Sequence, residues 1–288
     1  MTDSTITERG VCLKRLYISD LDGTLLDGDQ RVSERSAKLL RECIQKGAYF
    51  TFATARTAAS AVKITADIGV NVPCVLMNGV CVYDTSLRQY VRTEYISCEK
   101  SARIAAILDE KGQSAFMYRI SDGALSCEYT VLDSPEMQEF HDMRRNRYDK
   151  PFMRLESFSC SADGDVIYFA LLDKKERLDI IRDEIEKIGG LRYEFYRDIY
   201  NNNVWYLEIF SETASKLNGV KFLRERYGFD EIYGFGDNLN DLPLFEACDV
   251  RLAVENAKPE VKAAADFIIP SNTENGVAEW IYRNMPSI

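Results

Sequence analysis

Short apolar runs alternate with helical stretches in the first part of the chain. Three runs have the length and composition of buried strands, at residues 11–18, 48–54 and 74–77. Two helices are predicted between them, at residues 32–46 and 57–68. Ser33 is placed to cap the first of these helices and Gly47 to end it. This order predicts a parallel sheet with right-handed crossover connections.

The same alternation returns near the C-terminus. Strands are predicted at residues 231–235, 250–254 and 267–269, and helices at 215–227, 241–247, 259–264 and after 275. These elements extend the α/β pattern of the first part, so the two stretches are expected to form one domain from residues 1–83 and 210–288.

The segment between them, residues 84–209, has a different pattern. Strands are predicted at 114–119, 165–172 and 204–210, and helices at 99–111 and 174–188. Residues 134–149 are polar, charged and aromatic, and no element is assigned to them. We expect this segment to be an inserted α+β domain.

Polar side chains follow several of the predicted strands. Asp20 and Asp22 come directly after the first strand, Thr54 ends the second, and Asn78 follows the third. Ligands of parallel sheets bind at the carboxyl ends of the strands, so these side chains are expected to converge. Two carboxylates this close repel each other and lose hydration at a sheet edge, so a cation, most simply a metal ion, is expected beside them.

Composition excludes several classes of function. Hydrophobic residues make up 46% and charged residues 28%, as in globular proteins. A net charge of −10 and a pI of about 4.9 argue against nucleic acid as a partner. The polar first nine residues predict no signal peptide, and no apolar run is long enough to predict a membrane span. Eight scattered cysteines without a CxxC pair predict a reduced, cytoplasmic protein.

The residue types also limit the chemistry. A single histidine, His141, cannot build a histidine metal cluster, and no serine or cysteine nucleophile motif lies beside it. Acid–base chemistry is therefore expected to depend on carboxylates.

Four motifs stand in the order found in one known family. They are Asp-Leu-Asp-Gly-Thr-Leu-Leu at 20–26, Thr54 within 53–56, Ser215-Lys216, and Gly236-Asp237 followed by Asn240-Asp241. Together they resemble the haloacid dehalogenase-like (HAD) superfamily, and more narrowly its Cof-type phosphatases with a large α/β cap. The resemblance implies a Rossmann-like parallel-sheet core with an inserted α+β cap domain of the C2 type. Alone, Lys216 has the ordinary explanation of a surface lysine, and Asp237 and Asp241 that of helix caps.

The resemblance also implies roles for individual residues. Asp20 would be the nucleophile that forms an aspartyl-phosphate, and Asp22 the general acid and base, so the implied catalytic residues are Asp20, Asp22, Thr54 and Lys216. The implied Mg²⁺ ligands are Asp20, the backbone carbonyl of Asp22, Asp237 and, indirectly, Asp241. The residues implied to contact phosphate or substrate are Thr54, Ala55, Asn78, Lys216 and Asn240. Ala55 stands where the family usually has glycine, which alters the loop rather than the reaction.

The implied function is a Mg²⁺-dependent phosphatase of small phosphorylated metabolites, with sugar phosphates as the leading class. The alternatives are a phosphotransferase or phosphomutase on the same scaffold and a catalytically silent regulatory module. The expected assembly is a monomer or a homodimer. Aromatic side chains of the insert are expected to belong mostly to its own core.

Overall fold

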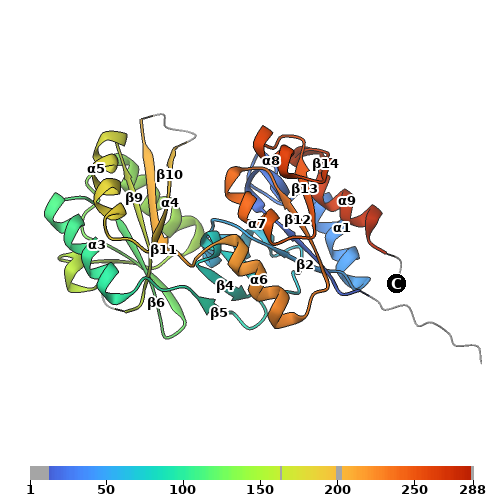
Figure 1. The fold of residues 1–288 in the computed structure, drawn as a ribbon, viewed down its shortest axis with the longest axis horizontal. Coiled ribbons are helices and arrows are strands. Elements are labelled where there is room, and N and C mark those ends of the chain that lie inside the picture. The colour runs from blue at the N-terminus through green and yellow to red at the C-terminus, as the bar shows by residue number, and fades with distance from the viewer. Residues whose placement is uncertain (1–12, 163, 199–202, 287–288) are drawn as a thin grey trace, which may run out of the picture.

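The computed structural model describes residues 13–162, 164–198 and 203–286. The described chain forms two lobes that lie side by side (Figure 1). One lobe, called the core lobe here, contains the first and last described elements of the chain and a five-stranded sheet. The other, called the cap lobe, runs from α3 to β11 and contains a six-stranded sheet. In the described part of the chain, no helix is both long and apolar enough to cross a membrane.

The core sheet is parallel, as predicted, with strand order β14-β13-β12-β1-β2. Its strands are β1 (Arg15–Ser19), β2 (Tyr49–Phe52), β12 (Glu231–Gly236), β13 (Val250–Val254) and β14 (Phe267–Ile269). The first strand begins later than predicted, and residues 11 and 12 lie outside the described residues. β1 lies between β12 and β2, and its side chains from Leu16 to Ser19 are almost completely buried.

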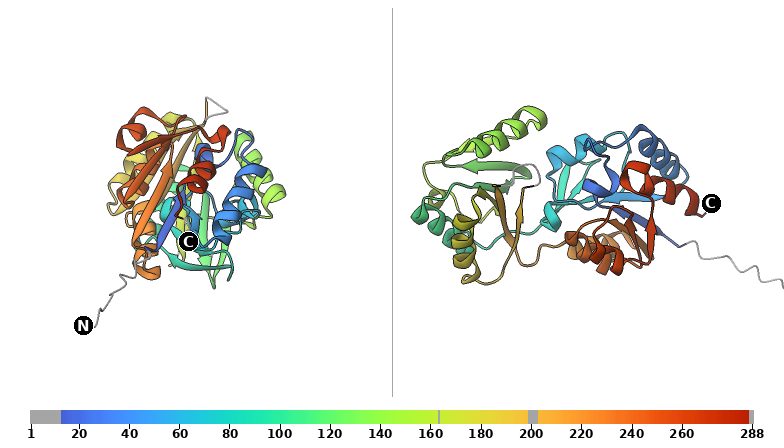
Figure 2. Two further views of the ribbon diagram at one scale, coloured as in Figure 1. Left: turned by 90° about the vertical axis from the view of Figure 1, so that its right-hand side faces the viewer. Right: turned by 90° about the horizontal axis from the view of Figure 1, so that it is seen from above.

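Helices cover both faces of this sheet (Figure 2). The core helices are α1 (Glu34–Gln45), α2 (Ala58–Thr65), α6 (Lys216–Tyr227), α7 (Leu242–Glu246), α8 (Pro259–Ala264) and α9 (Gly276–Asn284). α1 begins as predicted, because the Ser33 hydroxyl accepts a hydrogen bond from the backbone N–H of Ser36 at 3.0 Å. α1 and α9 pack against each other on one face, with α6, α7 and α8 on the other.

A small antiparallel sheet extends the core toward the cap lobe. It contains β3 (Cys74–Leu76), β4 (Cys81–Asp84) and β5 (Gln89–Thr93), and a single bridge between Ala53 and Val75 links it to the end of β2. β4 and β5 were not predicted. The Asp84 side chain shapes their turn, since it accepts hydrogen bonds from the backbone of residues 86 and 87. β5 lies within the segment that was expected to be inserted, but it pairs with β4 of the core lobe.

The cap sheet has the order β10-β11-β9-β6-β7-β8. Its strands are β6 (Phe116–Ser121), β7 (Ala124–Tyr129), β8 (Phe152–Arg154), β9 (Val166–Asp173), β10 (Leu191–Arg197) and β11 (Trp205–Ser211). Helices α3 (Cys98–Lys111) and α5 (Lys175–Glu186) pack on one face through an apolar cluster of their own. The predictions for β6, β9, β11, α3 and α5 are confirmed to within a few residues, whereas β7, β8 and β10 were not predicted.

The unassigned segment 134–149 is a helix, α4 (Pro135–Tyr148), which covers part of the other face of the cap sheet. Ser134 caps it by accepting a hydrogen bond from the N–H of Met137 at 3.1 Å. Few of its residues are buried, and Phe140 stacks on Phe116 of β6. The helix was missed because this narrow buried side is outnumbered by charged residues.

Candidate active site

The ends of β1, β2 and β12 lie next to one another at the carboxyl edge of the core sheet. The backbone N–H of Asp20 donates to the carbonyl of Phe235 at 2.9 Å, and the N–H of Ala53 donates to the carbonyl of Ser19 at 2.9 Å. Asp20 therefore follows β1 between Asp237, after β12, and Thr54, after β2. The predicted convergence of strand-end residues is observed for Asp20 and Thr54, and Asp237 joins them from the end of β12.

Lys216 links two buried carboxylates. Its Nζ lies 2.5 Å from Asp20 Oδ1 and 2.7 Å from Asp241 Oδ1, and all three side chains are buried. Burial opposes the charge of Lys216, but the two carboxylates outweigh it and raise its pKa. Burial and the neighbouring Asp241 raise the pKa of Asp20 well above its usual range, against the effect of Lys216. The first residue of α6 is thus a fixed cation between two acids that are 221 positions apart in the chain.

Asp241 holds the turn that carries Asp237. Its Oδ2 accepts hydrogen bonds from the N–H groups of Asp237 and Asn238 at 2.9 and 3.0 Å. These bonds close the 3₁₀ turn at Leu239–Asp241, while Oδ1 contacts Lys216. The Asp241 carboxylate therefore both caps this turn and contacts Lys216 in the site.

Asp237 is positioned from the loop after β1. Its Oδ1 accepts a hydrogen bond from the Thr24 hydroxyl at 2.7 Å. Burial raises the pKa of Asp237 to about 6, although the Thr24 bond opposes the rise. Gly23 has a φ of +81°, and a Cβ placed there would lie 2.6 Å from Asp237 Oδ2. A glycine is required at this position both for the backbone conformation and for the approach of Asp237.

The three carboxylates suit a divalent cation. One oxygen from each of Asp20, Asp237 and Asp241 lies within 4.8 Å of the other two. Lys216 supplies one positive charge to this group of three acids. An all-oxygen set with surplus negative charge is the donor set that Mg²⁺ prefers.

Asp22 lies outside this group of three. Its carboxylate is bound by Arg56 through two hydrogen bonds, from Nε to Oδ2 at 2.7 Å and from Nη2 to Oδ1 at 2.5 Å. Arg56 also donates to Gln30 at 2.9 Å. Asp20 and Asp22 are therefore paired with two different cations of the protein, Lys216 and Arg56. The partner of Asp22 was not predicted, although Arg56 lies only two residues after Thr54.

The remaining predicted residues lie on loops around the same edge. Thr54 is buried and Ala55 is exposed. Asn78 adopts a left-handed backbone with φ of +54°, and its N–H donates to the carbonyl of Thr54 at 3.0 Å. The Asn78 side-chain oxygen accepts a hydrogen bond from Asn240 at 3.3 Å. The loops after β2, β3 and β12 are thus tied together.

A small cavity of about 130 Å³ lies between the two lobes beside Lys216. The core lobe contributes Asn78, Lys216 and Asn240 to its wall. The cap lobe contributes Arg192 and Glu194 of β10, together with Phe210 of β11. Neither cap residue on β10 was predicted, since the strand itself was not recognised.

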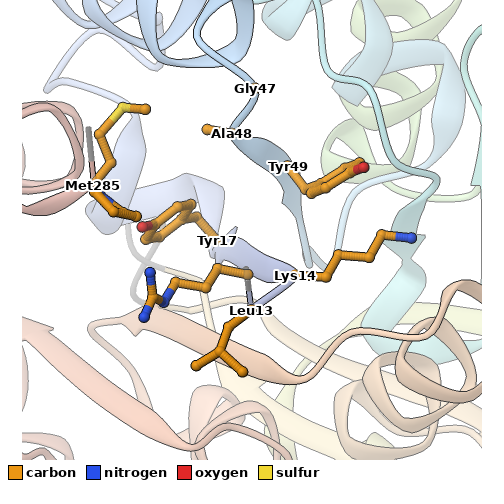
Figure 3. A pocket seen from close by; sticks show the side chains of 9 residues that line it. Leu13, Lys14, Tyr17, Gly47, Ala48, Tyr49 and Met285 are labelled. Carbon is orange, nitrogen blue, oxygen red and sulfur yellow. The ribbon is translucent and has the colours of Figure 1, made fainter. Parts of the chain in front are cut away.

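A second pocket lies at the opposite, amino end of the core strands, and Figure 3 shows the side chains that line it. Its wall includes Tyr17, Tyr49 and Met285, and only Lys14 and Arg15 of its lining residues carry charge. No carboxylate lines it within the described chain. The chemistry-bearing residues therefore favour the cavity between the lobes.

Comparison with known proteins agrees with this site. The family model for haloacid dehalogenase-like hydrolases matches residues 17–281. The 5-amino-6-(5-phospho-D-ribitylamino)uracil phosphatase YwtE of Bacillus subtilis is 27% identical over 280 residues, which cover 91% of this chain and 95% of YwtE. The chloroplastic endoribonuclease YBEY of Arabidopsis thaliana is 29% identical over 92% of this chain, which spans only 45% of that protein.

A solved structure shares the whole architecture. TM0651 from Thermotoga maritima superposes with a TM-score of 0.79 at 25% identity, covering 96% of this chain and 99% of that one. The predicted Rossmann-like core with an α+β cap is confirmed. Because the family model spans most of the sequence, the chain belongs to the haloacid dehalogenase-like hydrolases, within their Cof-type group, and is a phosphoric monoester hydrolase.

Proposed function

We propose that this protein is a Mg²⁺-dependent phosphatase of small phosphorylated metabolites, with sugar and polyol phosphates as the leading class. The observation that carries the proposal is the buried Asp20 carboxylate, which lies near Asp237 and Asp241 and contacts Lys216, a residue that also lines the small cavity. The name of the relative YwtE gives a phosphorylated ribitylamino compound as its substrate, which supports a polyol phosphate here.

The proposed metal ligands are Asp20, the backbone carbonyl of Asp22 and Asp237, with Asp241 acting indirectly. When bound, Mg²⁺ supplies positive charge that lets a carboxylate approach a phosphate dianion. Asp241 is already committed to Lys216 and to two backbone N–H groups, so its contribution is to hold the other groups in place. Thr24 and Gly23 fix the position of Asp237 in the same way.

The proposed reaction has two steps at phosphorus. A carboxylate oxygen of Asp20 bonds to phosphorus as the bond from phosphorus to the ester oxygen breaks, and Asp22 protonates that oxygen. Water then attacks the phosphorus of the aspartyl-phosphate, Asp22 accepts its proton, and Asp20 is released. Arg56 holds the Asp22 carboxylate through two hydrogen bonds, from Nε and Nη2.

Lys216 and the loop residues are proposed to bind the phosphoryl oxygens. The Lys216 ammonium already lies 2.5 Å from the Asp20 oxygen, next to the position where the transferred group would lie. Thr54, with its hydroxyl, and Ala55, through its backbone N–H, would add donors. Asn78 and Asn240 border the cavity from the core side.

An aryl phosphate assay with Mg²⁺ tests the proposal. We expect the wild type to release free phosphate and Asp20→Asn to lose roughly 10³-fold or more in kcat/KM. Asp67→Asn is a matched control, because Asp67 is exposed and its carboxylate has no hydrogen bond within the described chain. An isomeric product without free phosphate would show a mutase, and equal activity in Asp20→Asn would contradict the proposed mechanism.

A further inference from the structure

The cap side of the cavity is built by one edge strand. Arg192 and Glu194 lie two residues apart on β10, so both side chains leave the same face of the strand. That face borders the cavity opposite Asn78, Lys216 and Asn240. The part of a substrate that lies beyond its phosphate would therefore meet these two side chains.

Glu194 offers an unused acceptor. Its side chain is half-buried, and its carboxylate accepts no hydrogen bond within the described chain. Burial raises the pKa of Glu194, whereas the charges of Arg192 and Lys216 oppose the rise. The carboxylate thus lies within electrostatic reach of both cations that border the cavity, and Lys216 itself is already bound by two other carboxylates.

Arg192 supplies donors beside this acceptor. Its Nη1 donates to the carbonyl of Ala214 at 3.3 Å, which anchors the guanidinium to the segment between β11 and α6. The other N–H groups of Arg192 have no hydrogen-bond acceptor within the described chain. A hydroxyl group both donates and accepts hydrogen bonds, so neighbouring hydroxyls match a carboxylate placed next to a guanidinium.

We infer that Glu194 and Arg192 determine specificity for the leaving group, and that they select a neutral, hydroxyl-bearing group over one with a carboxylate or a second phosphate. Glu194 accepts a hydrogen bond from a substrate hydroxyl and repels an anion in the same place. This inference rests on the proposed phosphatase function. It names the substrate class that the cavity prefers.

The charge balance favours this class over an anionic leaving group. Arg192 alone would attract an anion, but it is exposed and therefore more screened by solvent than the half-buried Glu194. The cavity is also below the usual size range of ligand pockets, about 300–1,000 Å³, which suits a short chain of hydroxyl-bearing carbons.

Matched substrates test the inference. Glycerol 3-phosphate and 3-phosphoglycerate differ only in a hydroxymethyl group or a carboxylate at one end, and sorbitol 6-phosphate and 6-phosphogluconate form a longer pair of the same kind. An aryl phosphate, which has neither group, reports the chemistry alone. We expect the wild type to prefer the hydroxymethyl member of at least one pair.

Glu194→Gln should lower kcat/KM for the preferred polyol phosphate about 10- to 100-fold, because a hydrogen bond to a charged acceptor is lost. It should leave the aryl phosphate within about threefold and shift the preference toward the carboxylate substrate. Arg192→Gln should lower kcat/KM for the polyol phosphate without that shift. Glu176→Gln, an exposed charge removal on α5, is the matched control and should change none of these ratios.

The outcomes separate the two proposals. A wild type that hydrolyses aryl phosphate, with a polyol-to-carboxylate ratio that Glu194→Gln leaves unchanged, overturns the inference and leaves the phosphatase function standing. A wild type without activity on any of the five substrates overturns both. Thermal unfolding of each variant shows whether it is folded, and since glutamine has nearly the shape of glutamate, Glu194→Gln is expected to fold normally.

Discussion

Among the described residues, each lobe contains one deeply buried lysine, and the two have different surroundings. In the core, Lys216 lies between two carboxylates at 2.5 and 2.7 Å, and its pKa is raised. In the cap, Lys150 donates to the Tyr118 hydroxyl at 3.0 Å and lies over the Tyr118 ring at 4.1 Å. Burial lowers the pKa of Lys150 to about 8.

The difference shows that a buried charge does not by itself mark an active site. Lys216 belongs to a group of three acids and one cation that contact one another at short range, at the edge of the sheet where a ligand can bind. Lys150 is surrounded by aromatic groups, with Phe152 also near its ammonium. The Lys150 ammonium forms no ion pair with a carboxylate within the described chain. We infer that the core lysine serves chemistry and the cap lysine serves packing.

Removing the core lysine should have the largest effect. Lys216→Met leaves Asp20 and Asp241 buried without their cation, so we expect a loss of about 3–5 kcal/mol in the free energy of unfolding. Activity on aryl phosphate should fall by about 10²- to 10³-fold or more. Urea unfolding at pH 7 and steady-state kinetics measure the two effects, and stability equal to wild type would contradict the account of the core network.

The second-largest effect is expected from Gly23→Ala, which should displace the Asp237 side chain. Gly23→Ala would bring a Cβ to 2.6 Å from Asp237 Oδ2, and we expect Mg²⁺ affinity, read from activity against Mg²⁺ concentration, to fall about 10- to 100-fold.

Gly69→Ala is its matched control. Gly69 has a similar φ of +74°, but an added Cβ there meets no described atom within 4 Å. Gly69→Ala should lower the free energy of unfolding by about 1–2 kcal/mol without changing how activity depends on Mg²⁺ concentration. If activity depends on Mg²⁺ concentration in the same way in both variants, Gly23→Ala acts through backbone strain and not through the position of Asp237.

Removing the cap lysine should stabilise the protein. The folded pKa of about 8 lies below the ordinary 10.5, so the unfolded state binds more protons between these values and stability rises with pH across that window. The buried charge therefore has its full cost below pH 8, and Lys150→Met should add about 1–3 kcal/mol at pH 7. The gain should shrink as pH rises toward 10. Urea unfolding at pH 7 and 9.5 measures this gain in the free energy of unfolding. A large loss of stability at pH 7 would mean that Lys150 has a carboxylate partner, as Lys216 does.

The smallest effect is expected at the more exposed ion pair. The side chains of Arg56 and Asp22 are 15% and 48% exposed, so solvent screens their interaction. Arg56→Lys loses the bidentate hydrogen bonding to Asp22. It should nevertheless change the free energy of unfolding by less than about 1 kcal/mol. A loss as large as that of Lys216→Met would remove the distinction between buried and exposed pairs in this site.

Much of the core was predictable because its signals are local. The apolar strands end in recognisable polar residues, and the parallel topology then brings Asp20 and Asp237 together without further information. The pairings of Asp22 with Arg56 and of Thr24 with Asp237 were not predictable, because they depend on how loops distant in sequence meet.

The cap was harder to predict for a physical reason. Its edge strand β10 alternates apolar and charged residues and is only partly buried, and α4 buries only a narrow side. Neither has the long apolar run that identifies a central strand such as β9. The residues that face the cavity from the cap therefore depend on the pairing of β10 with β11, which places Arg192 opposite Phe210 and Glu194 opposite Glu208.

The central claim is that Asp20 forms a covalent bond to phosphorus. Rapid quenching of the enzyme during turnover, followed by borohydride reduction and peptide mapping by mass spectrometry, tests it directly. We expect the modification on the peptide that contains Asp20, dependent on substrate and Mg²⁺ and absent in Asp20→Asn. Modification of a different residue, or the same modified peptide in Asp20→Asn, would contradict the account.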